Sequence, residues 1–300
     1  MEIKLSLINQ KISEDPAGFI AECEERYYAQ VRTVADYVRA HYRERPIILL
    51  SGPSGSGKTT TAHLLEKLLD ESGHETHCLS MDDYFHPMSE QEKELAAAKK
   101  LDLESPARVD SALLKEQLQA ISEGKTVELP TYNFVTAARE YNGRTLTRKE
   151  GEIVILEGIH ALNPDVVGLP EEKTVRLYVS VRTRILGEDG SRLHPSSIRL
   201  MRRMLRDRVG RGRPAVETLR MFDSVQRGES LYIMPYKPHA LFDIDTLIPY
   251  EIGIYKKELS AELEKIPSKN ALRTILSFLE KSEAMEESLV PQNSLIQEFI

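Results

Sequence analysis

The sequence predicts an α/β protein with a doubly wound, mostly parallel sheet. Short apolar runs alternate along residues 46–250 with longer segments that carry the apolar spacing of amphipathic helices. The first run, 46–51, leads directly into the glycine-rich stretch GPSGSGKTT and then into a helical pattern. Strands that alternate with helices pair in parallel and place helices on both faces of one sheet. These two observations define the expected fold class.

The individual elements follow from the same patterns. We expect strands at 46–51, 76–81, 152–157, 174–180 and 242–248, and helices near 58–72, 108–123, 196–210 and 214–228. Residues 126–129 and 144–147 are expected to pair as a short hairpin around a loop at 130–143.

The ends of the chain predict helical extensions. Asp15-Pro16 is a helix-start signal, and residues 19–42 have the pattern of one amphipathic helix. After residue 250 the sequence is helical and charged. We therefore expect three parts, namely an N-terminal helical extension (1–45), a core domain (46–250) and a C-terminal helical tail (251–300).

Composition excludes several classes of protein. The 300 residues are 41% hydrophobic and 29% charged, which is typical of a soluble globular protein. Cys23 and Cys78 are too few for a disulfide framework or a zinc cluster, which favours a reducing cytoplasm. No apolar stretch approaches membrane-spanning length, and the first residues lack a signal-peptide pattern. The net charge of −7 argues against a general nucleic-acid binder.

Residues 52–59 fit the pattern of a phosphate-binding loop, G-x-x-x-x-G-K-T. Glycines let successive backbone N–H groups turn inward, and the helix that follows adds partial positive charge. We expect Lys58 to reach the β- and γ-phosphates of ATP and the Thr59 hydroxyl to bind Mg²⁺. The expected ATP-binding residues are Gly52, Ser54, Gly55, Ser56, Gly57, Lys58, Thr59 and Thr60.

Two predicted strands end in carboxylates. Asp82 and Asp83 follow the strand at 76–81, and Glu157 closes the apolar run IVIL. Function gathers at strand carboxyl ends in open α/β sheets, so Asp82 is a candidate to accept the proton of an attacking hydroxyl. Glu157 is expected to hold magnesium or orient the acceptor. Asp83 is interpreted as a turn residue and His160 as a structural histidine.

Seven arginines lie between residues 199 and 213 of this acidic chain. Arg199, Arg203 and Arg206 share one face of the predicted helix, opposite an apolar side. The RGRP stretch at 211–214 is expected to be a flexible hinge. We expect a lid over about 196–214 that closes on ATP and neutralises charge on the transferred phosphoryl group. A solvated basic helix and an RNA-binding segment are the alternatives.

With these motifs on the page, the sequence resembles the uridine kinase and phosphoribulokinase family over about 46–250. GPSGSGKTT resembles the family's phosphate loop, LSMDDYF its general-base segment and ILEGIHAL its metal-associated strand. The resemblance implies that Asp82 is the catalytic base and that Glu157 is associated with the metal. RLMRRMLRDRVGRGR resembles the lid, which implies catalytic roles for Arg211 and Arg213 beside Lys58.

The same resemblance implies an acceptor site. ESPARVD (104–110) and PTYNFVTAAR (130–139) resemble segments that contact the acceptor. The implied substrate-binding residues are Glu104, Tyr132, Arg139, Arg203 and Arg206. Three positions depart from the uridine–cytidine kinase pattern, because Ala137 replaces a base-reading histidine, Glu104 an aspartate and Met221 a glutamine.

The resemblance implies a P-loop nucleoside-kinase-like fold and an ATP- and Mg²⁺-dependent kinase. The first expectation for the acceptor is the 5′-hydroxyl of uridine or cytidine. Another small hydroxylated metabolite, such as a sugar, phosphosugar or polyol, stays open, as does a non-catalytic ATP-binding regulator. The expected partners are ATP and a small acceptor, without nucleic acid or membrane, in a cytoplasmic homo-oligomer.

Overall fold

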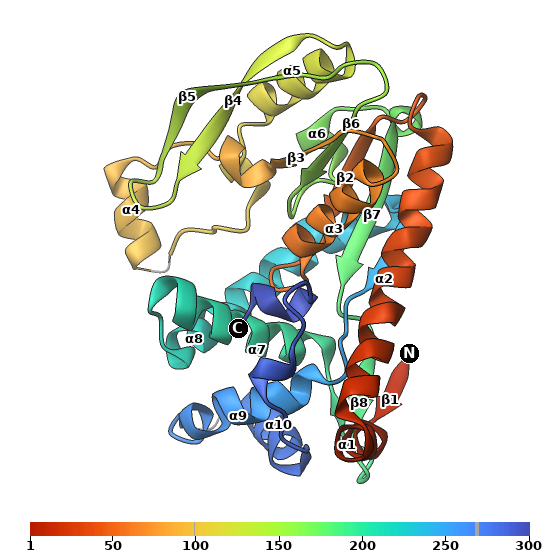
Figure 1. The fold of residues 1–300 in the computed structure, drawn as a ribbon. Helices are drawn as coiled ribbons and strands as arrows, with labels where there is room; N and C mark the ends of the chain where they lie inside the picture. The colour runs from red at the N-terminus through yellow and green to blue at the C-terminus, as the bar shows by residue number, and fades with distance from the viewer. Residues whose placement is uncertain (99, 268–269) are drawn as a thin grey trace.

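A five-stranded parallel sheet lies at the centre of the computed structural model, which describes residues 1–98, 100–267 and 270–300 (Figure 1). Each strand pairs in parallel with its neighbours. In spatial order the strands are β10 (Phe242–Asp245), β7 (Thr174–Ser180), β2 (Ile47–Ser51), β6 (Ile153–Glu157) and β3 (Thr76–Ser80). The predicted fold class and the five predicted strands are therefore confirmed.

Helices cover both faces of this sheet because alternate strand residues point to opposite sides. Ile48 and Leu50 belong to one buried cluster together with α2 and α3, whereas Ile47 and Leu49 belong to a second cluster with α5 and α6. The helices are α1 (Leu5–Glu14), α2 (Pro16–His41), α3 (Lys58–Asp70), α4 (Glu90–Ala97), α5 (Ser111–Ser122), α6 (Pro164–Val167), α7 (Pro195–Arg211), α8 (Ala215–Gly228), α9 (Glu251–Leu263) and α10 (Asn270–Lys281).

The hairpin differs from its prediction. β4 (Thr126–Asn133) pairs with β5 (Ala138–Thr147), so the connecting loop is only 134–137 and the expected loop at 130–143 is wrong. A register shift between Glu128 and Pro130 lets pairing continue beyond the proline. The Asn133 side chain closes the turn by accepting hydrogen bonds from the N–H groups of residues 135 and 136. Pro130 lies within β4 and is accommodated at this irregularity.

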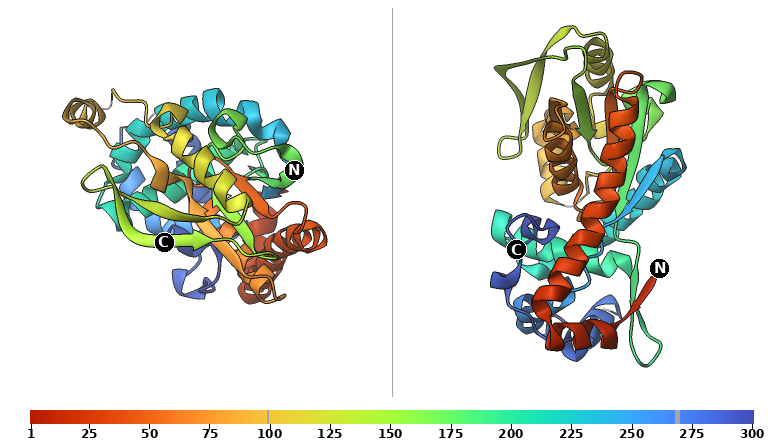
Figure 2. Two further views of the ribbon diagram at one scale, coloured as in Figure 1. Left: turned by 90° about the horizontal axis from the view of Figure 1, so that it is seen from above. Right: turned by 45° about the vertical axis from the view of Figure 1, so that its right-hand side comes forward.

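The N-terminal region is more elaborate than one helix. β1 (Glu2–Lys4) pairs in parallel with β8 (Arg184–Leu186), which pairs with β9 (Arg192–Leu193). The predicted helix start is confirmed, because the Asp15 side chain accepts a hydrogen bond from the Gly18 N–H at 2.9 Å. α2 then runs along the sheet beside α3 (Figure 2).

The C-terminal region returns to the core. After α9 and α10, residues 290–300 turn back toward the start of α3 (Figure 1), and Leu295 and Ile296 are fully buried. Side chains of both extensions belong to the cluster that also contains Ile48. The division of the chain at residues 45 and 250 stays a prediction. Among the described residues, no helix combines the length and apolar character needed to cross a membrane.

Candidate active site

The phosphate loop connects β2 to α3 at the carboxyl edge of the sheet. Gly52 passes so close to β7 that an added Cβ would lie 2.0 Å from the Val179 carbonyl oxygen. Gly57 has a φ of +82°, which favours glycine, and it directly precedes α3. The strand, glycine loop and helix that the motif requires are therefore present, with the first N–H groups of α3 directed to the loop.

Two buried groups hold carbonyls of this loop. Arg202 donates to the Gly55 carbonyl at 3.3 Å, and the Thr246 hydroxyl donates to the Ser56 carbonyl at 2.8 Å. Arg202 is itself paired with Glu251, and both side chains are fully buried. Because these carbonyl oxygens already accept hydrogen bonds from buried side chains, the loop can present its N–H groups to an anion. Sequence reasoning missed Arg202, whose only signal was an arginine among the apolar positions of α7.

Three arginines of α7 approach Ser54 from the other side of the loop. Arg203 donates to the Ser54 hydroxyl at 2.6 Å and Arg206 to the same oxygen at 3.4 Å. Arg199 donates to the Ser54 carbonyl at 3.4 Å and pairs with Glu229 at 2.6 Å. The predicted shared face of these three arginines is therefore confirmed. It places guanidinium groups next to the phosphate loop.

The last two arginines of the predicted lid lie elsewhere. Arg211 donates to Asp207 at 2.8 Å, and Arg213 donates to the same carboxylate at 3.3 Å. Asp207 is fully buried and also accepts the Thr218 hydroxyl at 3.0 Å. These hydrogen bonds fix the end of α7 against α8. Contact of Arg211 and Arg213 with ATP stays a prediction that depends on movement of this segment.

The strand-end carboxylates converge on the loop. β3 and β6 are neighbours, with Ser80 opposite Glu157, so the two strand ends meet. The Thr59 hydroxyl lies 3.5 Å from a Glu157 carboxylate oxygen, which also accepts the Ser80 hydroxyl at 3.2 Å. Asp82 follows in the short helix η1 (Met81–Tyr84). Hydroxyl and carboxylate oxygens are the ligands that hard divalent cations prefer, so Thr59 and Glu157 fit a metal.

Three carboxyl groups in this region have raised pKa values. Burial raises the pKa of Asp82, with Asp83 and Glu104 adding to the effect, whereas Lys58 opposes it. Burial also raises the pKa of Glu104 and of Glu157, again against the effect of Lys58. The Lys58 ammonium thus lowers the pKa of all three acids, and Arg203 and Arg206 have the same effect on Glu104 and Asp82 respectively. Perturbed groups of this kind gather at functional sites, and a bound cation would relieve their mutual repulsion.

The hairpin and η1 carry several of the residues that the family resemblance assigns to the acceptor. The Tyr132 N–H donates to Asp83 at 3.1 Å, so Asp83 connects the general-base segment to β4. Tyr132 is buried against Phe85, and among the described residues its hydroxyl has no hydrogen-bond partner. Arg139 pairs with Asp110 at 2.8 Å. An unpaired buried hydroxyl is a donor available to a ligand.

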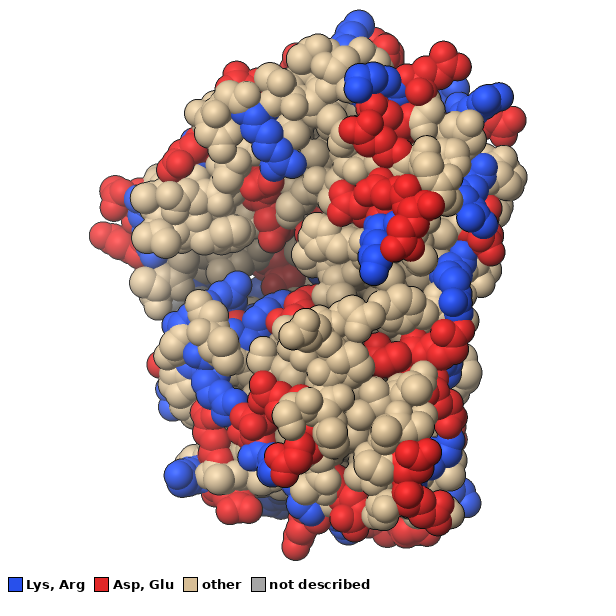
Figure 3. Space-filling model, viewed as in Figure 1, with Lys and Arg blue, Asp and Glu red and all other residues tan. Residues whose placement is uncertain are grey.

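Two other residues that the sequence singled out, Glu104 and His160, lie within electrostatic range of Lys58. Figure 3 shows a hollow on this face of the molecule, with acidic side chains in its depth and basic side chains along its lower edge. Glu104 packs against the last residue of α8, since a Cβ on Gly228 would lie 2.3 Å from the Glu104 Cβ. His160 is buried, which lowers its pKa to about 4 and keeps the imidazole neutral at neutral pH. Its buried Nδ1 atom has no hydrogen-bond partner among the described residues, so the interpretation of His160 as a structural histidine stays a prediction.

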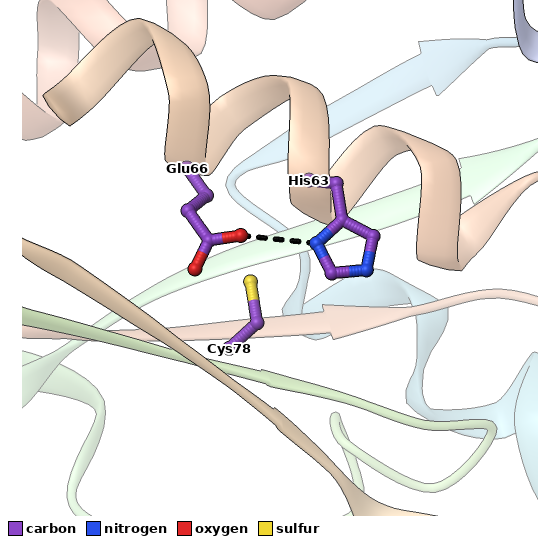
Figure 4. Close-up of side chains that lie close together, drawn as sticks. All are labelled: His63, Glu66 and Cys78. Carbon is purple, nitrogen blue, oxygen red and sulfur yellow. Dashed lines mark hydrogen bonds and ion pairs between the residues drawn. The ribbon is translucent and has the colours of Figure 1, made fainter. Parts of the chain in front are cut away.

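A second cluster of ligand-type side chains lies on α3 and β3, outside the phosphate site. His63 and Glu66 form a hydrogen bond of 3.0 Å, and the Cys78 thiol lies beside them (Figure 4). Burial and the neighbouring Glu66 raise the pKa of the Cys78 thiol well above its usual range. A protonated thiol is a poor metal ligand. Binding of the expected metal by Thr59 and Glu157 stays a prediction.

Comparisons with known proteins agree with this geometry. The family model "Phosphoribulokinase / Uridine kinase family" matches residues 47–248. Uridine kinase of Lactobacillus johnsonii is 30% identical over 69% of this chain and 87% of its own length. Uridine kinase of Staphylococcus aureus strain JH9 is 32% identical over 74% of this chain and 95% of its own.

One solved structure also shares the fold. YFH7 from Saccharomyces cerevisiae, reported as a candidate P-loop-containing kinase with a circular permutation, matches with a TM-score of 0.50 and 11% identity. The match covers 68% of this chain and 95% of that one.

The fold and the phosphate loop define a P-loop kinase, an ATP-dependent phosphotransferase that acts on a hydroxyl group. The chain belongs to the phosphoribulokinase/uridine kinase family. Membership implies ATP as co-substrate, a divalent metal and a small-molecule acceptor.

Proposed function

We propose that this kinase uses Mg²⁺ and transfers the γ-phosphoryl group of ATP to the 5′-hydroxyl of a pyrimidine nucleoside or a close analogue. The observation that carries the proposal is the position of Asp82. It follows β3 at the carboxyl edge of the sheet, close enough to Lys58 for the ammonium to lower its pKa against the effect of burial. This supports a role for Asp82 as a base that acts near a phosphate-binding cation.

Each residue has a chemical role in this proposal. Asp82 accepts the proton of the acceptor hydroxyl, whose oxygen forms a bond to the γ-phosphorus while the bond to the β–γ bridging oxygen breaks and ADP leaves. The raised pKa makes Asp82 a stronger base than a solvated aspartate. Lys58 and the arginines at Ser54 neutralise charge on the transferred group. Thr59 and Glu157 would hold Mg²⁺, which neutralises charge on the β- and γ-phosphates.

A nucleoside acceptor is supported by the aromatic and polar groups around Tyr132. Phe85 and Phe134 contact the Tyr132 ring edge-on, with centroids 5.6 and 5.1 Å away. Aromatic faces suit a planar base, and the unpaired Tyr132 hydroxyl and the carboxylate of Glu104 suit its polar groups and the ribose hydroxyls. Two relatives at about 30% identity are named uridine kinase. Ala137 stands where the uridine–cytidine kinase pattern has a base-reading histidine. The loss of that polar group allows a base preference that differs from the one in the pattern.

The test is a coupled ADP-release assay with Mg²⁺-ATP against nucleosides, sugars, phosphosugars and polyols. We expect the highest kcat/KM for uridine or cytidine and loss of turnover in Asp82→Asn while ATP still binds, because the amide keeps the shape but cannot take the proton. Asp83→Asn is the matched control, since its amide oxygen can still accept the Tyr132 N–H. A preference for a sugar or polyol would reject the nucleoside, and full activity of Asp82→Asn would reject the assigned base.

A further inference from the structure

Residues 290–300, the C-terminal segment, pack directly on the phosphate loop. A Cβ added to Gly57 would come within 2.6 Å of the Leu295 Cδ1 atom, so Leu295 fills the space that glycine leaves open. The Phe299 ring lies under the Arg202 guanidinium, 5.0 Å from its carbon, and is almost fully buried. In Figure 1 the chain end lies between α3 and α7, beside the loop. The segment is therefore part of the site's immediate surroundings.

The Glu298 carboxylate accepts hydrogen bonds from groups of the loop that could otherwise donate to a phosphate. One Glu298 carboxylate oxygen accepts the Thr60 hydroxyl at 2.6 Å and the Thr60 N–H at 3.4 Å. Thr60 is in the first turn of α3, where backbone N–H groups have no partner within the helix. The other oxygen lies 3.7 Å from Arg206, which also contacts Ser54. A carboxylate with these partners occupies an anion position of the loop.

The segment is anchored just before these residues. The Ser294 hydroxyl donates to Glu24 of α2 at 2.7 Å, and the Asn293 amide donates to the Tyr28 hydroxyl at 2.7 Å. Ser294 also shares a hydrogen bond of 3.1 Å with the Tyr250 hydroxyl, and none of these side-chain contacts involves the phosphate loop. Residues 293–294 therefore keep the chain attached when residues 295–300 leave the loop, a movement that exposes the buried side chains of Leu295, Ile296 and Phe299.

We propose that the C-terminal segment is an internal competitor of the nucleotide, with Glu298 in place of a nucleotide phosphate. The inference rests on the proposed role of the loop in binding ATP. Two anions cannot share the Thr60 donors, so ATP binds only when Glu298 withdraws. The segment lowers the apparent affinity for ATP in proportion to the fraction of molecules in which Glu298 is seated.

A purely supporting role for the segment predicts the opposite result. If residues 290–300 only held the loop in shape, loss of the Glu298 contacts would loosen the loop and weaken ATP binding. Competition predicts stronger binding. For a seated fraction of nine in ten, removal of the carboxylate raises the affinity about tenfold. Glu298→Gln should give a smaller gain, because the amide oxygen still accepts from Thr60 but the negative charge is gone.

The experiment measures Mg²⁺-ATP affinity of the full chain by calorimetry for the native protein, Glu298→Ala, Glu298→Gln and the control Glu287→Ala. Glu287 is an exposed acid of the same region, in the short helix Glu287–Leu289. We expect about tenfold tighter binding for Glu298→Ala, a smaller gain for Glu298→Gln and no change for Glu287→Ala. Hydrogen exchange of 290–300 should rise when ATP is added to the native protein.

The outcomes separate the two proposals. Equal or weaker ATP binding by Glu298→Ala, with measurable binding by the native protein, overturns the competition and leaves the proposed function intact. Absence of ATP binding by both proteins, with both folded by circular dichroism, overturns the proposed function and the inference with it. If ATP affinity rises as much in Glu287→Ala as in Glu298→Ala, the gain is a general charge effect. This result overturns the assignment of the competing carboxylate to Glu298.

Discussion

The guanidinium of Arg202 and the carboxylate of Glu251 form a fully buried ion pair with two hydrogen bonds, of 2.8 and 2.9 Å. The pair connects α7 to the first turn of α9. Tyr255 adds a third hydrogen bond to the same carboxylate, at 2.7 Å. Because Arg202 also donates to the Gly55 carbonyl, the pair links the C-terminal helices to the phosphate loop. The loop's shape therefore depends on residues far away in the sequence.

Glu251→Gln should be strongly destabilising. It leaves the Arg202 charge buried without its counter-charge, which costs about 3–5 kcal/mol of unfolding free energy. Glu258→Gln is the matched control, since Glu258 pairs with Arg208 at 2.7 Å where about a third of each side chain is exposed. We expect Glu258→Gln to lose less than about 1 kcal/mol of unfolding free energy. Urea unfolding measures both, and equal losses in the two variants would contradict the importance of the buried pair.

Lys58→Ala should abolish phosphoryl transfer while the fold persists. Lys58 opposes the raised pKa values of Asp82, Glu104 and Glu157, so its charge serves the site and not the core. We expect kcat to fall by at least about 10²- to 10³-fold, as for removal of one preorganised donor. Lys67→Ala, an exposed residue of the same helix that pairs with Glu71, is the control. Native turnover in Lys58→Ala would reject the site.

Arg211→Ala and Arg213→Ala test the lid. Both arginines bind Asp207 in this structure, so any contact with ATP arises only on closure. Each substitution should lower kcat roughly 10²- to 10³-fold and change ATP affinity much less. Arg220→Ala, on the exposed side of α8, should leave both unchanged. Unaltered kcat together with altered RNA affinity would instead support a nucleic-acid role for this segment.

Glu152 should make the fold sensitive to acid. Burial alone would raise its pKa, but hydrogen bonds from the Lys149 N–H and from His77 outweigh burial and lower the pKa to about 2, from 4.5. A carboxyl group whose pKa is lower in the folded state than in the unfolded state stabilises the fold at pH values above its unfolded-state pKa. This stability is lost as pH falls from about 4.5 to about 2.

The corresponding variant is Glu152→Gln. We expect it to lose up to roughly 3 kcal/mol of unfolding free energy at pH 7 and almost none near pH 2. Glu150→Gln, an exposed neighbour, is the control. Urea unfolding at several pH values measures the difference, and a loss that is independent of pH would show that the carboxylate charge does not matter.

Position 137 tests the choice of acceptor. Ala137 lies in the β4–β5 turn with a φ of +54°, a conformation that histidine tolerates better than most side chains. Ala137→His should raise kcat/KM for uridine or cytidine relative to other acceptors by roughly 5- to 150-fold, the worth of one good hydrogen bond of about 1–3 kcal/mol. Ala137→Gly relieves the backbone without adding a side chain and should not change the preference. An unchanged acceptor profile in Ala137→His would place residue 137 outside the acceptor site.

The sequence by itself determined the sheet, the phosphate loop and the strand-end carboxylates. These features depend on local information. Residues 47–50 are continuously apolar, which fits a strand buried on both faces, and Gly57 has a φ of +82°, a local backbone conformation that favours glycine. The arginine face of α7 was also predictable, because helical spacing brings residues three and four apart to one side.

Only the tertiary structure decided which distant groups meet. Pairing continues past Pro130 because a register shift accommodates it, and no local pattern specifies that shift. Arg211 and Arg213 bind Asp207 because the end of α7 packs on α8. Glu298 reaches Thr60 across 238 positions of sequence. Contacts of this kind arise when the helices pack around the sheet. The free energy of that packing comes from the whole core, so the local sequence of the two contacting segments does not encode it.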